Sequence, residues 1–172
     1  MADRIDRAIA ALSRIRESLR SSGNRERLGR FSCHGCVAWC CREGFNAMRA
    51  TPLEALAIAR RVEADGAAAA ILPRLGEAVE RWRLDDVRPR TYTCPFLTAG
   101  NLCGIHEVKP LGCVTFTPVR DGGCDQDAAR LKEAIGRARS LGEDAGLKGD
   151  DAPLPVAVAR ALDLRRRPAR RR

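Results

Sequence analysis

Eight cysteines in a chain of 172 residues are the side chains best suited to do chemistry. They fall into two clusters, with none between residues 42 and 93. The clusters are Cys33, Cys36, Cys40 and Cys41, and then Cys94, Cys103 and Cys113 followed by Cys124. Thiols at such close spacing suit either a disulfide framework or a site for a soft or borderline metal ion.

Features of the sequence that indicate the cellular compartment favour a metal site over a disulfide framework. Residues 1–7 carry charges of both signs and lack the apolar core of a secretory signal. The longest apolar run, residues 67–72, is far shorter than the roughly 20 residues that span a bilayer. We therefore expect a cytoplasmic protein without membrane contact, in which the thiols stay reduced and bind metal rather than form disulfides.

The spacing within the first cluster suggests how its thiols are used. Cys33 and Cys36 form a chelating turn, in which backbone amides can stabilise thiolate charge. Cys40 and Cys41 are adjacent, and because neighbouring side chains usually diverge, we expect the pair either to serve two sites or to leave one thiol outside the coordination shell. Four thiolates hold one zinc ion or one [4Fe–4S] cluster, so the sequence allows one site or two and either metal.

Few other residues offer metal or acid–base chemistry. The two histidines, His34 and His106, each lie beside a cysteine cluster. We interpret His34 as a partly exposed neighbour and leave His106 open as a ligand or a hydrogen-bond donor to sulfur. Glu43 and Glu107 are the carboxylates nearest to the cysteines in sequence. They are therefore the preferred candidates for a functional carboxylate.

The rest of the chain predicts a helical scaffold for these loops. Apolar residues at helical spacing predict an amphipathic helix over residues 1–22 and further helices over residues 67–84 and 155–164. Thr51, Pro52 and Glu54 form a capping-box pattern that opens a helix reaching about residue 65. Asp125 is the expected N-cap of a helix ending at Leu141.

Only short extended pieces are expected. Residues 94–104 contain a turn sequence that suits a short hairpin, and residues 114–117 have strand propensity. The predicted fold is a small, mainly α domain with two irregular cysteine-rich metal-binding loops. We divide the chain into an N-terminal helix (1–22), a cysteine-cluster domain (28–141), a linker with a C-terminal helix (142–164) and a disordered arginine-rich tail (165–172).

The basic charge is concentrated at the C-terminus. The net charge is +9, but residues 160–172 alone contain seven arginines and one aspartate, so the remainder is nearly balanced. Such a tail could contact nucleic acid through salt-dependent phosphate interactions. No aromatic residue is interleaved with the arginines, so base stacking is not indicated and a nucleic-acid partner is not favoured.

The cysteine pattern resembles a known family. Its order and spacing over residues 30–118, with Cys-Pro-Phe-Leu from Cys94 and Cys-Gly-Ile-His from Cys103, are similar to the YkgJ-type cysteine-cluster family, described as a putative zinc- or iron-chelating domain. The family usually has Tyr at the position of His106, Arg at Lys109 and Arg at Val114. The resemblance implies seven metal ligands: Cys33, Cys36, Cys40, Cys41, Cys94, Cys103 and Cys113. Cys124 lies outside the motif and either completes a site or is a bystander.

Two functions remain open at this stage. The first is a metal-binding protein that holds an iron–sulfur cluster or zinc, with a structural, redox or metal-delivery role, for which a protein partner is one possibility. The second is a metal-dependent protein-modifying enzyme, because the resemblance extends to flagellin lysine N-methylases, which contain a related cysteine cluster and use S-adenosylmethionine. No GxGxxG loop follows a predicted strand, so no cofactor cradle is recognisable in the sequence.

Overall fold

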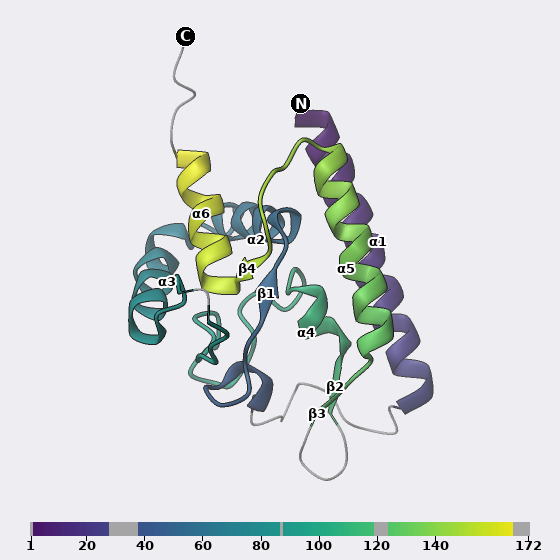
Figure 1. Ribbon diagram of the computed structural model, residues 1–172, viewed down its shortest axis with the longest axis horizontal. Helices are drawn as coiled ribbons and strands as arrows, with labels where there is room; N and C mark the ends of the chain where they lie inside the picture. Colours follow the sequence, from purple (N-terminus) through teal and green to yellow (C-terminus); the bar gives the residue numbers. More distant parts are fainter. Residues whose placement is uncertain (1, 28–37, 87, 119–123, 167–172) are drawn as a thin grey trace.

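Helices make up most of the chain in the computed structural model, which describes residues 2–27, 38–86, 88–118 and 124–166 (Figure 1). The elements in order are α1 (Ala2–Arg27), a 3-10 turn η1 (Trp39–Cys41), β1 (Arg49–Ala50), α2 (Pro52–Ala64), α3 (Ala68–Trp82), α4 (Leu111–Thr115), β2 (Phe116–Pro118), β3 (Cys124–Gln126), α5 (Ala128–Asp144), β4 (Ala152–Pro153) and α6 (Leu154–Arg166). The prediction of a mainly α fold is confirmed.

Strands occur only as short antiparallel pairs in the described part of the chain. β1 pairs with β4, so that Arg49 lies opposite Pro153. β2 pairs with β3, and an isolated bridge joins Leu97 to Cys103. The bridge confirms the predicted hairpin within residues 94–104.

Three helix boundaries differ from the prediction. α1 does not end at residue 22 but continues to Arg27, because a single glycine costs a helix only about 1 kcal/mol relative to alanine. The N-cap of α5 is Asp127 rather than Asp125, since Asp125 pairs with Thr117 in the β2–β3 ladder. α5 also runs past Leu141 to Asp144.

Two predictions made from local propensity are also corrected. Residues 114 and 115 belong to α4, and only residues 116–118 form a strand. α6 extends to Arg166, and Arg165 forms an ion pair with Glu63 of α2 at 2.5 Å. The first two residues of the predicted disordered tail are therefore helical, and residues 167–172 lie outside the described part of the chain.

The apolar core forms two clusters that share α2. One cluster combines α2, α3 and α6 with the loop that carries Tyr92, Cys94 and Phe96. The other combines α1, α2, α4 and α5, and it includes the fully buried Leu12, Leu53 and Leu111. Figure 1 shows α1 and α5 side by side on one flank and α3 with α6 on the other. None of the described helices is long and apolar enough to cross a bilayer.

The start of α2 forms the predicted capping box. Thr51 Oγ1 accepts a hydrogen bond from Glu54 N at 3.2 Å, and Glu54 Oε2 accepts one from Thr51 N at 2.8 Å. A second oxygen of the same carboxylate, Oε1, accepts from Leu111 N at 2.7 Å. Glu54 therefore joins the start of α2 to the start of α4.

Replacing Thr51 by alanine is expected to lower the free energy of unfolding by about 1 kcal/mol, because the Glu54 amide loses its cap. Urea denaturation measures the change. The matched control is Ser13→Ala, which removes an exposed hydroxyl from α1 and is expected to change stability by less than about 0.5 kcal/mol. Equal effects of the two substitutions would contradict a stabilising role for the cap.

Candidate metal centre

The first cysteine loop is described from residue 38 onward. Ala38 adopts left-handed backbone angles, φ 59° and ψ 37°, and its carbonyl accepts a hydrogen bond from Cys41 N at 2.9 Å. This turn forms η1 and carries Cys40 and Cys41, both half-buried. The chain then becomes extended at Arg42.

The adjacent thiols of Cys40 and Cys41 lie close enough to act on each other's pKa, and the Cys94 thiol raises the pKa of Cys41. Both residues lie in the short 3-10 turn η1, and Cys41 is its last residue. The geometry of a regular α-helix or β-strand, in which adjacent side chains point apart, therefore does not apply to this pair. Both thiols therefore belong to the same group, and whether the pair serves two sites or leaves one thiol outside the coordination shell stays a prediction.

Backbone hydrogen bonds hold the second cysteine loop against the first. Cys94 N donates to Cys41 O at 2.8 Å, and Tyr92 N donates to Asn46 O at 2.9 Å. The fully buried Tyr92 donates its hydroxyl to Met48 O at 2.5 Å, and burial raises the pKa of this phenol well above its ordinary value. Cys94 is itself buried, so the contact between the loops excludes water from this thiol.

A tight turn brings Cys103 back toward Cys94. Thr98 N donates to Leu102 O at 2.9 Å and Gly104 N donates to Phe96 O at 2.9 Å. A Cβ at Gly104 would lie 3.1 Å from Phe96 O, so glycine permits this close approach. The hairpin therefore places the Cys103 backbone opposite Leu97, three residues after Cys94.

The fifth described thiol, Cys113, comes from α4. Burial raises the pKa of Cys113 well above its ordinary value, the Lys109 charge opposes that rise, and Cys103, Cys40 and Cys41 add to it. For Cys41, the hydrogen bond from Cys40 lowers the pKa, but Cys94, burial and the charge of Cys103 raise it to about 12. These effects link Cys113 to Cys40, Cys41 and Cys103, and they link Cys41 to Cys94.

The donor set of this group fits a thiophilic metal. The five thiols come from three segments that are separated in sequence. Within the described ranges, no three Cys, His, Asp or Glu side chains are already arranged around one ion position. A metal ligand must be a thiolate, so binding zinc or iron here requires loss of protons from the thiols and an adjustment of the sulfur positions.

A family model supports the same chemistry. The CxxCxxCC family, described as a putative zinc- or iron-chelating domain, matches residues 32–134, which is more than half of the chain. The chain belongs to this family. No curated protein and no solved structure matches it. Membership of the CxxCxxCC family supports metal binding by the chain and leaves the choice between zinc and iron undecided.

Four of the predicted site residues are described only in part or not at all. Cys33, Cys36 and His34 lie outside the described residues. The backbone of Cys124 begins β3 opposite Pro118, but its side chain is not described. The structure therefore brings together five of the eight candidate ligands of this CxxCxxCC domain and does not place the other three thiols.

The remaining candidates lie at the edge of the group. His106 is exposed and follows the Cys103 turn, where its backbone N donates to Cys103 O at 3.2 Å. The carboxylate of Glu107 accepts from Arg61 at 2.5 Å, and Glu43 is exposed. Of these three residues, Glu107 already forms an ion pair with the guanidinium of Arg61.

Lys109 was missed as a functional residue by the sequence reasoning. Only 9% of it is exposed, and its charge lowers the pKa of both Cys40 and Cys113. A cation beside a cluster of thiolates favours their charged form. The available signal was its position between Cys103 and Cys113, because the chain has only three lysines.

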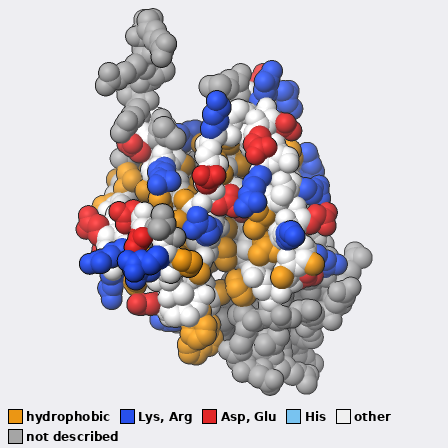
Figure 2. Space-filling view, in the orientation of Figure 1, with side chains coloured by type: hydrophobic (Ala, Val, Ile, Leu, Met, Phe, Trp, Pro, Cys, Tyr) orange, Lys and Arg blue, Asp and Glu red, His pale blue; other side chains and the backbone are white. Residues whose placement is uncertain are grey.

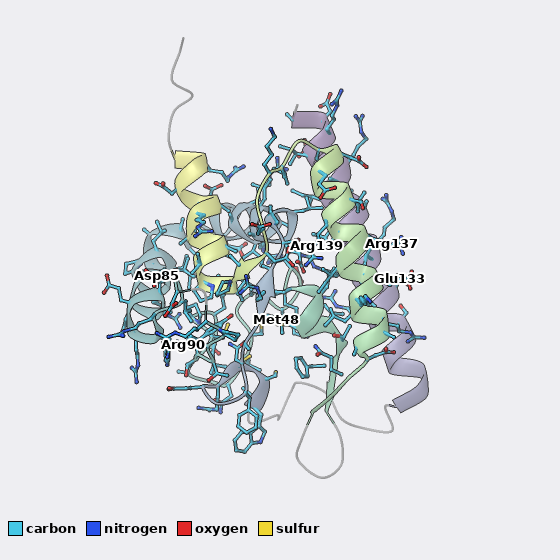
Figure 3. All side chains as sticks on the ribbon, viewed as in Figure 1. Met48, Asp85, Arg90, Glu133, Arg137 and Arg139 are labelled. Atoms are coloured by element: carbon cyan, nitrogen blue, oxygen red, sulfur yellow. The ribbon has the colours of Figure 1, made fainter. Side chains whose placement is uncertain are left out.

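A cavity of about 840 Å³ is lined by one member of the thiol group, Cys40. Cys40 lines its edge, together with Phe45, Met48, Phe116 and Arg139, and Figure 3 labels Met48 near α4 and Arg139 on α5. Cavities of this size accommodate small-molecule ligands in many proteins. Beside it, Trp39 and Phe45 meet edge to face with ring centroids 4.9 Å apart.

Proposed function

We propose that the protein binds zinc or an iron–sulfur cluster in the cytoplasm through thiolates of its two cysteine loops. The observation that supports this proposal is that Cys40, Cys41, Cys94, Cys103 and Cys113, from three separate segments, interact with one another as one group of thiols. Four thiolates complete a tetrahedral zinc site or hold a [4Fe–4S] cluster. Cys33, Cys36 and Cys124 are further candidate ligands.

A structural, redox or metal-delivery role follows most simply from this donor set. A bound metal would cross-link the loop before α2, the loop after α3 and the short helix α4, which are far apart in sequence. Because metal binds only the folded arrangement, it adds to the stability of the fold. We propose residues 28–141 as the metal-binding domain, with α1 and α6 packed on it.

Thiol protection tests this function. The purified protein and a chelator-treated sample are alkylated under native conditions, and the labelled cysteines are mapped by mass spectrometry. We expect the ligand thiols to be labelled at least about tenfold more slowly before chelation, because a metal-bound thiolate is not free to react. Identical labelling of all cysteines in the two samples would contradict the proposal.

A metal-dependent enzyme is the second candidate, and the cavity that reaches Cys40 is the observation that favours it. A structural site is closed by four protein ligands, whereas a catalytic site keeps a position for water or substrate. Cobalt-substituted protein distinguishes the two. Imidazole should leave the visible spectrum unchanged at a closed site and shift it at an open one.

Nucleic-acid binding remains the least favoured function. The face in Figure 2 shows Arg and Lys side chains interspersed with Asp and Glu rather than gathered into one basic patch. Arg165, at the start of the arginine-rich end, pairs with Glu63. Mixed charge of this kind is typical of a solvated surface rather than of a groove that follows a phosphate backbone.

A further inference from the structure

α1 lies outside the residues matched by the family model, yet it contacts the loop between two candidate ligands. Arg16 and Arg20 are one helical turn apart and therefore lie on the same face of α1. Both extend to residues 106–109, which connect Cys103 to Cys113. These contacts span more than 80 residues of sequence.

The two guanidinium groups bind three carbonyl groups of that loop. Arg20 Nη2 donates to His106 O and Glu107 O, both at 2.9 Å. Arg16 Nε donates to Lys109 O at 3.0 Å. Carbonyl groups in irregular backbone have no helix or sheet partner, so donors from elsewhere determine how such a loop is held.

α2 holds the same loop from another side. Glu54 Oε1 accepts from Leu111 N at 2.7 Å, and Arg61 binds the Glu107 carboxylate at 2.5 Å. Arg16 and Glu54 therefore fix the residues immediately before and after Pro110. α4 begins at Leu111 and carries Cys113 two residues later.

Arg16 is an unusual residue to place in a core. Only 2% of it is exposed, and burial lowers its pKa to about 10, although the charge of Glu54 opposes that shift. One of its η nitrogens is buried without a hydrogen-bond partner among the described residues. An apolar side chain would pack at this position without leaving a buried donor unpaired, so packing alone does not explain the arginine.

We propose that Arg16 and Arg20 are positioning residues of the metal centre, which hold the 103–113 loop so that Cys103 and Cys113 face the other thiols. The proposal rests on the proposed function, because it assigns α1 a part in the same site. The metal-binding unit then includes α1 in addition to the cysteine loops. Lys109, whose carbonyl Arg16 binds, is held with its charge beside Cys40 and Cys113.

The test compares Arg20→Met and Arg16→Met with Arg14→Met, an exposed arginine of the same helix. Methionine keeps much of the side-chain length and removes the donors. The first readout is the rate at which a chelator removes metal from the purified protein. We expect release to be roughly 10- to 100-fold faster in the Arg16 and Arg20 variants and unchanged in the control, as for other residues that orient metal ligands.

The second readout separates positioning from general destabilisation. In metal-free protein, alkylation of Cys103 and Cys113 should rise by about tenfold in the Arg20 variant while Cys41 stays as in the wild type. A purely structural role would raise the labelling of all five thiols together. Arg20→Lys should restore much of the wild-type behaviour, because an ammonium group can also donate to the two carbonyl groups.

Three outcomes decide the matter. Selective labelling with faster metal release supports the inference, even if Arg16→Met fails to fold, because the partly exposed Arg20 tests it independently. Wild-type release rates with wild-type labelling, or uniform labelling of all thiols, overturn it. Wild-type protein that binds no metal overturns the proposed function instead, and the labelling pattern of the Arg20 variant still decides whether α1 holds the loop.

Discussion

Replacing Cys41 by serine is expected to lower metal affinity by more than roughly 100-fold, beyond the loss typical of a residue that only orients a ligand. Cys41 is central to the thiol group, because the thiols of both Cys40 and Cys94 shift its pKa and its carbonyl accepts a hydrogen bond from the Cys94 amide. A serine hydroxyl preserves the size of the side chain but does not provide a thiolate. Metal content per chain and competition with a chromophoric chelator measure the loss.

The matched control for this substitution is Val114→Ser, which introduces the same hydroxyl beside Cys113 without removing a thiol. It should retain the metal. Cys40→Ser provides the informative comparison, because the two adjacent thiols lie in one group. If each substitution removes a different fraction of the metal, the pair serves two sites; if Cys41→Ser retains wild-type affinity, its assignment as a ligand is wrong.

Replacing Glu54 by alanine is expected to lower the free energy of unfolding by about 2–5 kcal/mol. The buried carboxylate accepts from Thr51 N at the start of α2 and from Leu111 N at the start of α4. Its loss removes half of the capping box, leaves the Leu111 amide unpaired, and removes a negative charge that acts on the buried Arg16. Three helices are therefore affected by one substitution.

Urea denaturation of the purified protein measures this effect. Glu77→Ala removes an exposed carboxylate from α3 and serves as the control, with an expected change of less than about 0.5 kcal/mol. Glu54→Gln should fall between the two, because one acceptor oxygen remains. A change of less than 0.5 kcal/mol for Glu54→Ala itself, on the order of an exposed substitution, would show that the buried carboxylate is not a structural link.

Local patterns in the sequence predicted much of this fold. The helical content and the capping box at Thr51 and Glu54 are confirmed, because propensity and capping depend on residues close in sequence. The second role of Glu54, as acceptor for Leu111 N, depends on a residue 57 positions away and could not be predicted from spacing. Asp125 failed as a predicted cap because its pairing with Thr117 in a strand overrides its local preference.

At the candidate site, too, local patterns were predictable from the sequence and the three-dimensional contacts were not. The two cysteine clusters identified the thiols, since closely spaced cysteines are informative without any structure. The mutual effect of the Cys40 and Cys41 thiols on their pKa values could not be predicted, because both residues lie in an irregular turn that follows the left-handed Ala38. The contribution of Arg16 was also missed, since a buried arginine on an amphipathic helix looks like a surface residue in sequence.

Elemental analysis of anaerobically purified protein, together with its visible spectrum, tests the central claim most directly. We expect stoichiometric iron or zinc. Iron with a broad absorption band near roughly 400 nm indicates an iron–sulfur cluster, and colourless protein with zinc indicates a zinc site. Protein that contains neither metal in stoichiometric amount, and whose eight thiols all react freely under native conditions, would contradict metal binding by this chain.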